Sequence, residues 1–270
     1  MFSTHRTLSS GLALLSLWAS AAAEPAALTK EDLAAAVRTD DFTIPTPGEF
    51  MAAIDKFAKL AWKTKYRASI PTNFTSRPQM ALNLGTLIAD GYIAVQAQDA
   101  QTVKNVGKDI IALAKPLGVQ AEIVNRGKRL AELAEDEQWD VLKEELEATQ
   151  NEAKTKLADN QDADLVALVT IGGWVRATQV ISSHIIDHYS PAAAKLLRQP
   201  GVVTLLVEKL NALPAKLHDD VAVKYTRAKL AELQTAVSFA TDAEPSAADV
   251  QKINTIAAEL VRELSKKELK

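Results

Sequence analysis

The stretch that decides the fold runs from Asp162 to Tyr189 and reads DADLVALVTIGGWVRATQVISSHIIDHY. On a helix it is apolar on nearly every side, because only Arg176, Gln179 and the end from His184 to His188 interrupt the apolar surface. A helix with one face in water shows a polar stripe every three or four residues. This stretch has no such stripe, so it predicts a helix buried among other helices.

The same stretch is too short in its uninterrupted part to cross a bilayer. Its apolar run from Leu165 to Val175 stops at Arg176. A bilayer requires about 20 consecutive apolar residues. We therefore expect a core helix, and no transmembrane span in the mature chain.

Two adjacent glycines, Gly172 and Gly173, lie in the middle of this helix, where each costs about 1 kcal/mol relative to alanine. Glycine is useful where another backbone must come close. A second helix, expected from Pro78 to Gln98, carries Gly85 and Ala89 one turn apart. Small residues on facing helices let the axes approach at the short end of the usual range of about 8–10 Å. We predict that the two helices cross at these positions.

Asp90 and Arg176 are each set into one of these apolar helices, and a buried charge without a partner is costly. If the helices cross as predicted, the two charges meet. We favour a buried ion pair that fixes the helix register, with Arg77 or Asn83 nearby. The alternative is a ligand-binding pocket for an anionic or amide group, lined by Arg77, Asp90 and Arg176 and floored by Trp174.

His184 and His188 lie four residues apart on one face of the central helix, a spacing that can hold Zn²⁺. The motif HIIDH is close to the metal-binding pattern H-x-x-E-H, but Asp187 stands where the general base is Glu. A third ligand is needed, and His218 is the one further histidine of the mature chain. We favour the interpretation that both imidazoles stabilise the negative C-terminal end of the helix.

The first 23 residues read as a secretory signal peptide. His5 and Arg6 form its basic region, residues 11–18 are apolar, and Ala21-Ala22-Ala23 supplies a small-x-small cleavage site. We predict that residues 24–45 form a flexible leader with a short helix, and that residues 46–270 form a single all-helical domain. The mature chain is then expected in the periplasm of a Gram-negative host, and is otherwise secreted.

Composition excludes several classes of function. The chain has no cysteine, which rules out disulfides, a lipobox anchor and thiol catalysis. Its 31 Lys and Arg against 34 Asp and Glu give a net charge of −3. Because no basic cluster is interleaved with aromatic residues, we expect no nucleic-acid partner. No motif for a cofactor is present, so we expect none.

The rest of the chain predicts an all-α protein. Strand-like alternation is nowhere sustained, whereas apolar residues recur at spacings of three and four. Connections are short, so we expect an irregular array of antiparallel helical hairpins, about eight to nine helices, around one buried central helix. The longer helices are expected over residues 46–68, 78–98, 99–117, 120–134, 137–157, 162–189, 215–240 and 247–264.

Because the sequence contains no complete catalytic constellation, we expect an exported, non-catalytic helical protein. Its partner would be a small molecule or another protein. One alternative is a metal-dependent hydrolase that uses His184, Asp187 and His188, with His218 as a further ligand. Another is a repeat-like scaffold whose groove holds an extended peptide.

Overall fold

The computed structural model describes residues 44–269 except 58–59, 161 and 241–242, so the predicted signal peptide and most of the predicted leader lie outside the described residues. The described residues form helices joined by short connections and contain no strand, which confirms the all-α prediction. The helices are α2 (Pro47–Asp55), η1 (Trp62–Lys65, a 3₁₀ turn), α3 (Arg77–Gln96), α4 (Ala100–Leu117), α5 (Gln120–Glu135), α6 (Trp139–Asp159), α7 (Ala163–Asp187), α8 (Pro191–Ala194), η2 (Lys195–Leu197), α9 (Pro200–Asn211), α10 (Ala215–His218), α11 (Val221–Ala236) and α12 (Ala247–Leu264).

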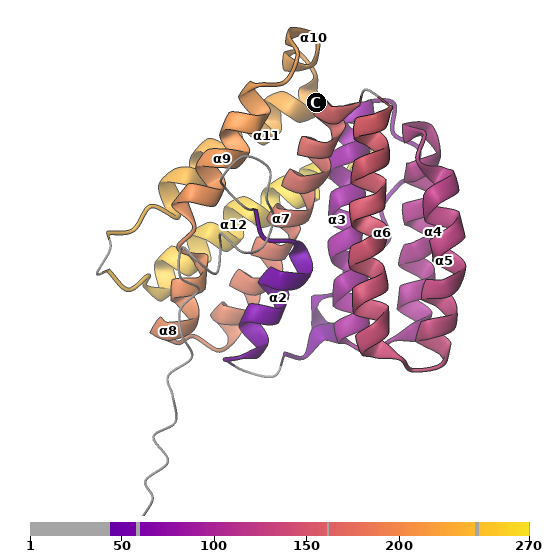
Figure 1. The fold of residues 1–270 in the computed structure, drawn as a ribbon. Helices are drawn as coiled ribbons and strands as arrows, with labels where there is room; N and C mark the ends of the chain where they lie inside the picture. The colour runs from indigo at the N-terminus through magenta and orange to yellow at the C-terminus, as the bar shows by residue number, and fades with distance from the viewer. Residues whose placement is uncertain (1–43, 58–59, 161, 241–242, 270) are drawn as a thin grey trace, which may run out of the picture.

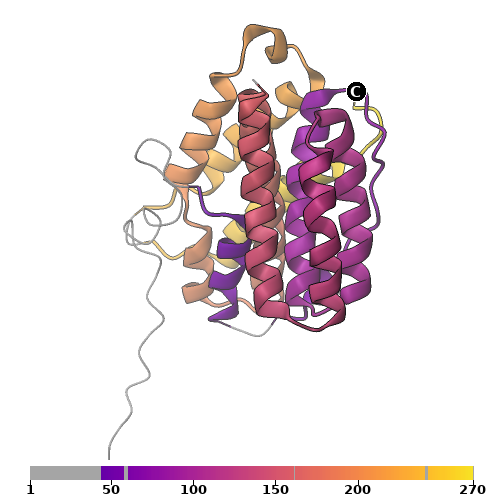
Figure 2. The same ribbon diagram turned by 45° about the vertical axis from the view of Figure 1, so that its right-hand side comes forward.

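The predicted central helix is α7, which lies in the middle of the molecule (Figure 1). On one side of it, α3 to α6 form a four-helix bundle, and on the other side lie α9, α11 and α12 (Figures 1 and 2). One helix among the described residues, α7, is long and apolar enough to cross a membrane, judged by length and composition alone. In the 18-residue stretch of α7 with high hydropathy, 78% is buried inside the protein, as expected for a core helix.

The predicted crossing of α3 and α7 is confirmed. A Cβ atom added at Gly85 would overlap the backbone carbonyl oxygen of Val169 on α7. One added at Gly172 would overlap the carbonyl oxygen of Leu82 on α3. Gly173 is less crowded, because its added Cβ would lie 3.0 Å from the side chain of Pro47. Gly85 and Gly172 are therefore required because the two helices touch backbone to backbone.

The length predicted for the helix over residues 46–68 is wrong. Thr46 caps α2 at the predicted start, in a capping box with Glu49, but the helix ends at Asp55 instead of continuing to residue 68. The chain then forms only the short turn η1 and continues in extended form. This leaves the carbonyl of Lys65 free to accept a hydrogen bond from Arg176 at 2.7 Å. Inside a continuing helix, that carbonyl would be occupied by the backbone four residues later.

The helix predicted over residues 215–240 is also interrupted, because the structure divides it into α10 and α11. Asp220 lies at the break and accepts hydrogen bonds from the backbone of Ala222 at 2.9 Å and of Val223 at 3.2 Å. Its second oxygen accepts from Ser76 at 2.6 Å, at the start of α3. A carboxylate with these contacts is an N-cap, and it starts a new helix where the apolar spacing alone suggested continuity.

The N-cap of α4 leads to a prediction on the pH dependence of stability. Asp99 accepts a hydrogen bond from the backbone of Thr102 at 2.9 Å and another from the Tyr66 hydroxyl at 3.3 Å. The Thr102 backbone bond, more than any other contact, lowers the pKa of the Asp99 carboxyl. A lowered carboxyl pKa contributes stability above the unfolded-state value, near pH 4, and this stability is lost as pH falls through the folded-state value.

Asp99→Ala is therefore expected to cost about 0.5–2 kcal/mol of unfolding free energy at pH 7. Its deficit relative to wild type should shrink below about pH 4. Urea unfolding at pH 7 and pH 3 measures both effects. Asp99→Asn is the control, since it retains a capping oxygen that does not titrate. An equal deficit for Asp99→Ala at both pH values would contradict the assignment.

Candidate functional site

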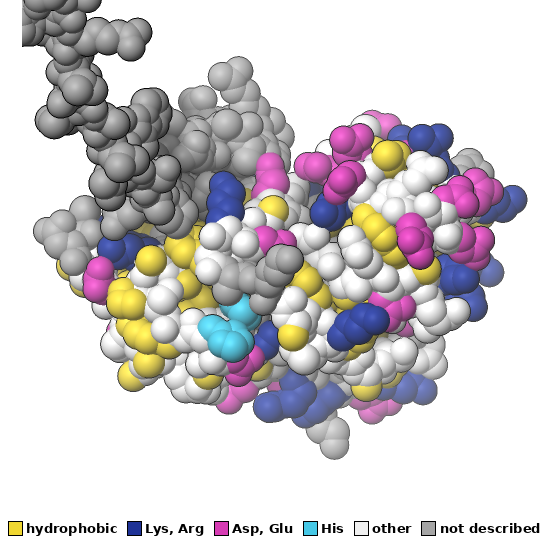
Figure 3. Space-filling view, turned by 90° about the horizontal axis from the view of Figure 1, so that it is seen from below, with side chains coloured by type: hydrophobic (Ala, Val, Ile, Leu, Met, Phe, Trp, Pro, Cys, Tyr) yellow, Lys and Arg dark blue, Asp and Glu magenta, His cyan; other side chains and the backbone are white. Residues whose placement is uncertain are grey.

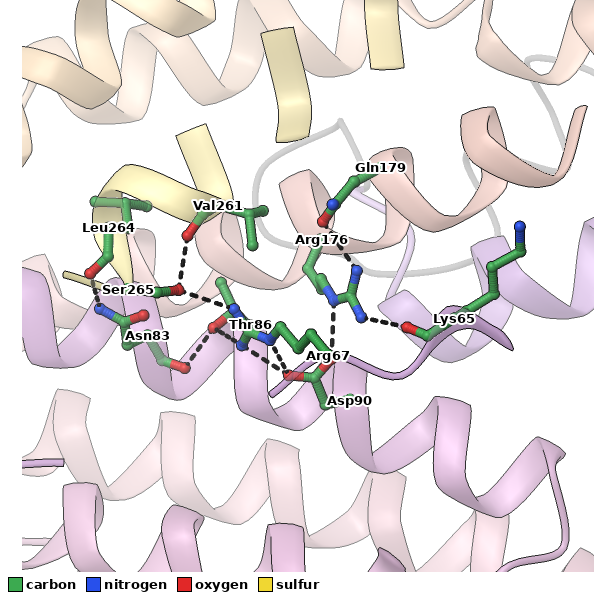
Figure 4. Close-up of polar contacts among 10 residues, drawn as sticks. All are labelled: Lys65, Arg67, Asn83, Thr86, Asp90, Arg176, Gln179, Val261, Leu264 and Ser265. Atoms are coloured by element: carbon green, nitrogen blue, oxygen red, sulfur yellow. Dashed lines mark hydrogen bonds and ion pairs between the residues drawn. The ribbon is translucent and has the colours of Figure 1, made fainter. Parts of the chain in front are cut away.

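The predicted ion pair exists, and it has a third member. Asp90 on α3 accepts a hydrogen bond from Arg176 on α7 at 2.8 Å (Figure 4). The other carboxylate oxygen of Asp90 accepts from Arg67, in the extended segment after η1, at 2.7 Å. The three side chains are 11%, 4% and 18% exposed, respectively. Two arginines therefore share one carboxylate in the interior of the protein.

The remaining guanidinium nitrogens of both arginines are also satisfied (Figure 4). Their acceptors lie at 2.7–3.0 Å and are Thr86, Gln179, Ser265 and the carbonyl of Lys65. Ser265 directly follows α12, so Arg67 reaches the negative end of that helix dipole. Burial lowers the pKa of Arg67, and the charge of Asp90 opposes this effect. The guanidinium groups of both arginines are thus hydrogen-bonded within the protein, and these bonds join α3, α7, α12 and the segment after η1.

The other residues predicted around the pair lie elsewhere. Arg77 forms a partly exposed ion pair with Asp162 at 2.7 Å. Trp174 is buried and its indole nitrogen donates to Gln199 at 3.1 Å. Asn83 donates to the carbonyl that ends α12, at 2.7 Å. The predicted partners Arg77 and Asn83 are therefore replaced by Arg67, a residue expected in a helix and found in an extended segment.

A polar pocket of about 200 Å³ opens beside Asp90, between α3, α4 and residues 66–70. Of the four residues predicted to form a ligand pocket, Asp90 lines this one, whereas Arg77, Trp174 and Arg176 do not. Asp109 lines it as well, and burial followed by the charge of Asp90 raises the pKa of Asp109. Arg67 lines the same pocket and pairs with Asp90 at 2.7 Å, so the pocket carries charges of both signs and this guanidinium is already engaged by a carboxylate.

The histidine motif lies at the C-terminal end of α7, where Figure 3 shows histidine side chains at the surface. His184 is buried and His188 is exposed, with ring centroids 5.2 Å apart. Burial, then the charges of His188 and Lys65, lower the pKa of His184. Asp187 is engaged by Lys65, which pairs with it at 2.7 Å.

The predicted third metal ligand is not near this pair. His218 belongs to α10, at the opposite end of the molecule from α8, which follows the end of α7 (Figure 1). Within the described part of the chain, no group of three or more His, Cys, Asp or Glu is arranged to hold a metal ion. The structure therefore does not assemble the ligand set His184, His188 and His218.

A second cavity lies inside the bundle of α3, α4, α5 and α6, among residues not predicted to form a site. Its volume is about 320 Å³. Apolar side chains from all four helices line it: Val95, Val103, Val106, Ile110, Ile111, Val124, Leu130, Ala131, Leu142 and Leu146. The further lining residues are three glycines and three lysines. A cavity of this size with an apolar lining and few polar groups has the character of a small-molecule site.

The glycines that line this cavity differ from those at the crossing of α3 and α7. A Cβ atom added at Gly107 would have no atom within 4 Å. One added at Gly127 would lie 3.6 Å from Ile111, and one at Gly91 would lie 3.7 Å from Leu146, both ordinary contacts. No neighbouring backbone requires glycine at these three positions. What they do is leave room in the cavity, at a cost in helix stability of about 1 kcal/mol each.

Comparisons with known proteins add no assignment. No family model, no curated protein and no solved structure matches the chain. Function therefore has to be argued from the geometry of this molecule.

The sequence contained one signal for the apolar cavity. Gly107 and Gly127 each interrupt an amphipathic helix away from its ends, where glycine is unfavourable. Gly91 lies on the side of α3 that faces Leu146 and Val106, away from the crossing with α7. Only the packing of four helices distinguishes a glycine that permits a backbone contact from one that keeps a cavity open.

Proposed function

We propose that this is a non-catalytic binding protein that holds the apolar part of a small molecule in the cavity of α3 to α6. The observation that carries the proposal is the cavity itself, with its apolar lining and its three glycines that no neighbouring backbone requires. With the secretory signal predicted at residues 1–23, the protein would act as an exported carrier or sensor of that molecule.

Energetics support a binding site over a packing defect. Interiors of proteins contain few voids larger than a water molecule. Larger side chains in this space would bury more apolar surface, which stabilises by about 25 cal/mol per Å², yet the chain leaves about 320 Å³ open. A leucine at residue 107 would fill part of it, and the chain has glycine there.

The chemistry of the lining supports binding without catalysis. Among the described lining residues there is no carboxylate, imidazole, hydroxyl or thiol group, so lysine is the one type of lining side chain able to act in proton transfer or nucleophilic attack. The lysines are the only ionisable groups among the lining residues that the structure describes. Such a site can hold a ligand and exclude water from it.

Titration calorimetry with decan-1-ol tests the proposal. We expect one molecule to bind per chain, with a negative heat-capacity change from the burial of apolar surface. Thermal unfolding should shift upward with ligand concentration, because a ligand that binds only the folded state stabilises it.

Gly107→Leu should abolish this binding, because the new side chain extends into the cavity. Gln101→Leu is the matched control, since it places the same side chain on an exposed position of α4 outside the lining. It should bind decan-1-ol as the wild type does. The proposal fails if the wild type binds no decan-1-ol, or if Gly107→Leu binds it unchanged.

A further inference from the structure

We infer that the ligand is a single-chain anionic amphiphile of the alkanoate class, with its tail in the cavity and its head group at Lys108 and Lys128. This inference rests on the proposed function and adds the chemistry of the ligand. It follows from the charge, the sequence pattern and the size of the same site.

The ionisable groups among the described lining residues are all positive. These are Lys104, Lys108 and Lys128, and no described carboxylate lines the cavity. Lys104 is paired with Glu135 at 3.0 Å, whereas Lys108 and Lys128 have no ion-pair partner among the described residues. Both are exposed, so they lie where the apolar cavity meets solvent. A ligand that leaves a negative group at this mouth complements the site.

The two unpaired lysines occur in the same local pattern on neighbouring helices. Residues 105–108 of α4 read NVGK and residues 125–128 of α5 read NRGK. In each, the glycine lines the cavity and the lysine that follows lines it too. α4 and α5 pack against each other, and both Gly-Lys pairs line the same cavity. The glycine removes a side chain from the path of a tail, and the lysine supplies a cation for its head.

The volume distinguishes a single chain from a double one. A methylene group is about as large as a water molecule, which occupies roughly 30 Å³ of liquid. A cavity of about 320 Å³ therefore accepts a tail of about ten carbons. The two long acyl chains of a membrane phospholipid exceed this volume several-fold. The site consequently fits a free alkanoate.

Calorimetric titrations of the full chain with sodium decanoate and with decan-1-ol test the inference. Decanoate is expected to bind on the order of tenfold more tightly, because hydrogen bonds to a charged group are the stronger ones. Raising NaCl to 0.5 M should weaken decanoate binding and leave decan-1-ol binding unchanged.

The double variant Lys108→Gln/Lys128→Gln should lose the preference for decanoate and keep its affinity for decan-1-ol. Lys115→Gln, an exposed position of α4 outside the lining, is the matched control and should behave as the wild type. Equal affinity of the wild type for both compounds would overturn the inference and leave the proposed function standing. Binding of neither compound would overturn both.

Two further measurements complete the test: titration with alkanoates of different chain length, and binding to vesicles. Affinity should rise about fourfold for each methylene from hexanoate to decanoate, the gain expected for a buried methylene. It should stop rising for chains much longer than the cavity. Vesicles of phosphatidylglycerol should not bind the protein. If the protein binds such vesicles and does not bind free decanoate, the ligand is a membrane surface and the inference is wrong.

Discussion

Gly172→Ala is expected to destabilise the protein severely, whereas Gly107→Ala should stabilise it, although both replace a glycine inside a helix. A methyl group at residue 172 would overlap the carbonyl oxygen of Leu82, which is backbone and cannot rotate away. The two most closely packed helices would have to separate. Overpacking of a core costs about 1–3 kcal/mol and sometimes more. We expect the backbone clash at residue 172 to cost about 3 kcal/mol or more.

At residue 107 the added methyl group meets no atom within 4 Å. The change therefore removes the unfavourable helix propensity of glycine and should add about 0.5–1 kcal/mol of stability. Urea unfolding of the two variants beside wild type measures the difference, which should exceed 3 kcal/mol or so in total. Gly173→Ala, whose nearest neighbour is a proline side chain at 3.0 Å, should fall between them. Equal midpoints for Gly172→Ala and Gly107→Ala would show that α3 and α7 do not touch as described.

Asp90→Ala is expected to have the second large effect. Asp90 is the carboxylate that both Arg67 and Arg176 contact, so its removal leaves two buried guanidinium groups without a counter-charge. Removing one partner of a buried ion pair typically costs about 3–5 kcal/mol. The partly exposed pair of Arg77 and Asp162 provides the control, because Arg77→Ala should cost at most about 1 kcal/mol.

A double variant separates the loss of the ion pairs from general damage to the core. In Asp90→Ala/Arg67→Met, one of the stranded positive charges is gone, so the unfolding free energy should recover in part relative to Asp90→Ala alone. Urea unfolding of wild type, both single variants and the double variant completes the cycle. Costs that simply add would show that Asp90 and Arg67 do not interact.

The sequence by itself determined the features that depend on near neighbours in the chain. The helices predicted from residues 46 and 247 begin within one residue of those positions, because the capping oxygens of Thr46 and Ser246 satisfy backbone groups only three residues away. The burial of α7 followed from its apolar surface, and its contact with α3 followed from glycines that a solvated helix would not carry. The pairing of Asp90 with Arg176 was also predictable, since two charges on buried helices require partners.

Only the tertiary structure decided which distant groups complete these features. Arg67 joins Asp90 because the helix predicted to run to residue 68 ends at Asp55, and no local pattern shows where a helix gives way to tertiary contacts. His218 lies away from His184 because α10 packs at the other end of the molecule.

The apolar cavity was the least predictable part of the candidate site. It is space that side chains from α3, α4, α5 and α6 do not fill, so it depends on the relative positions of four helices at once. A residue's own chemistry and near neighbours determine whether it must be buried or paired. What it is buried against, and where space remains, depend on the distances between segments that the chain brings together only on folding.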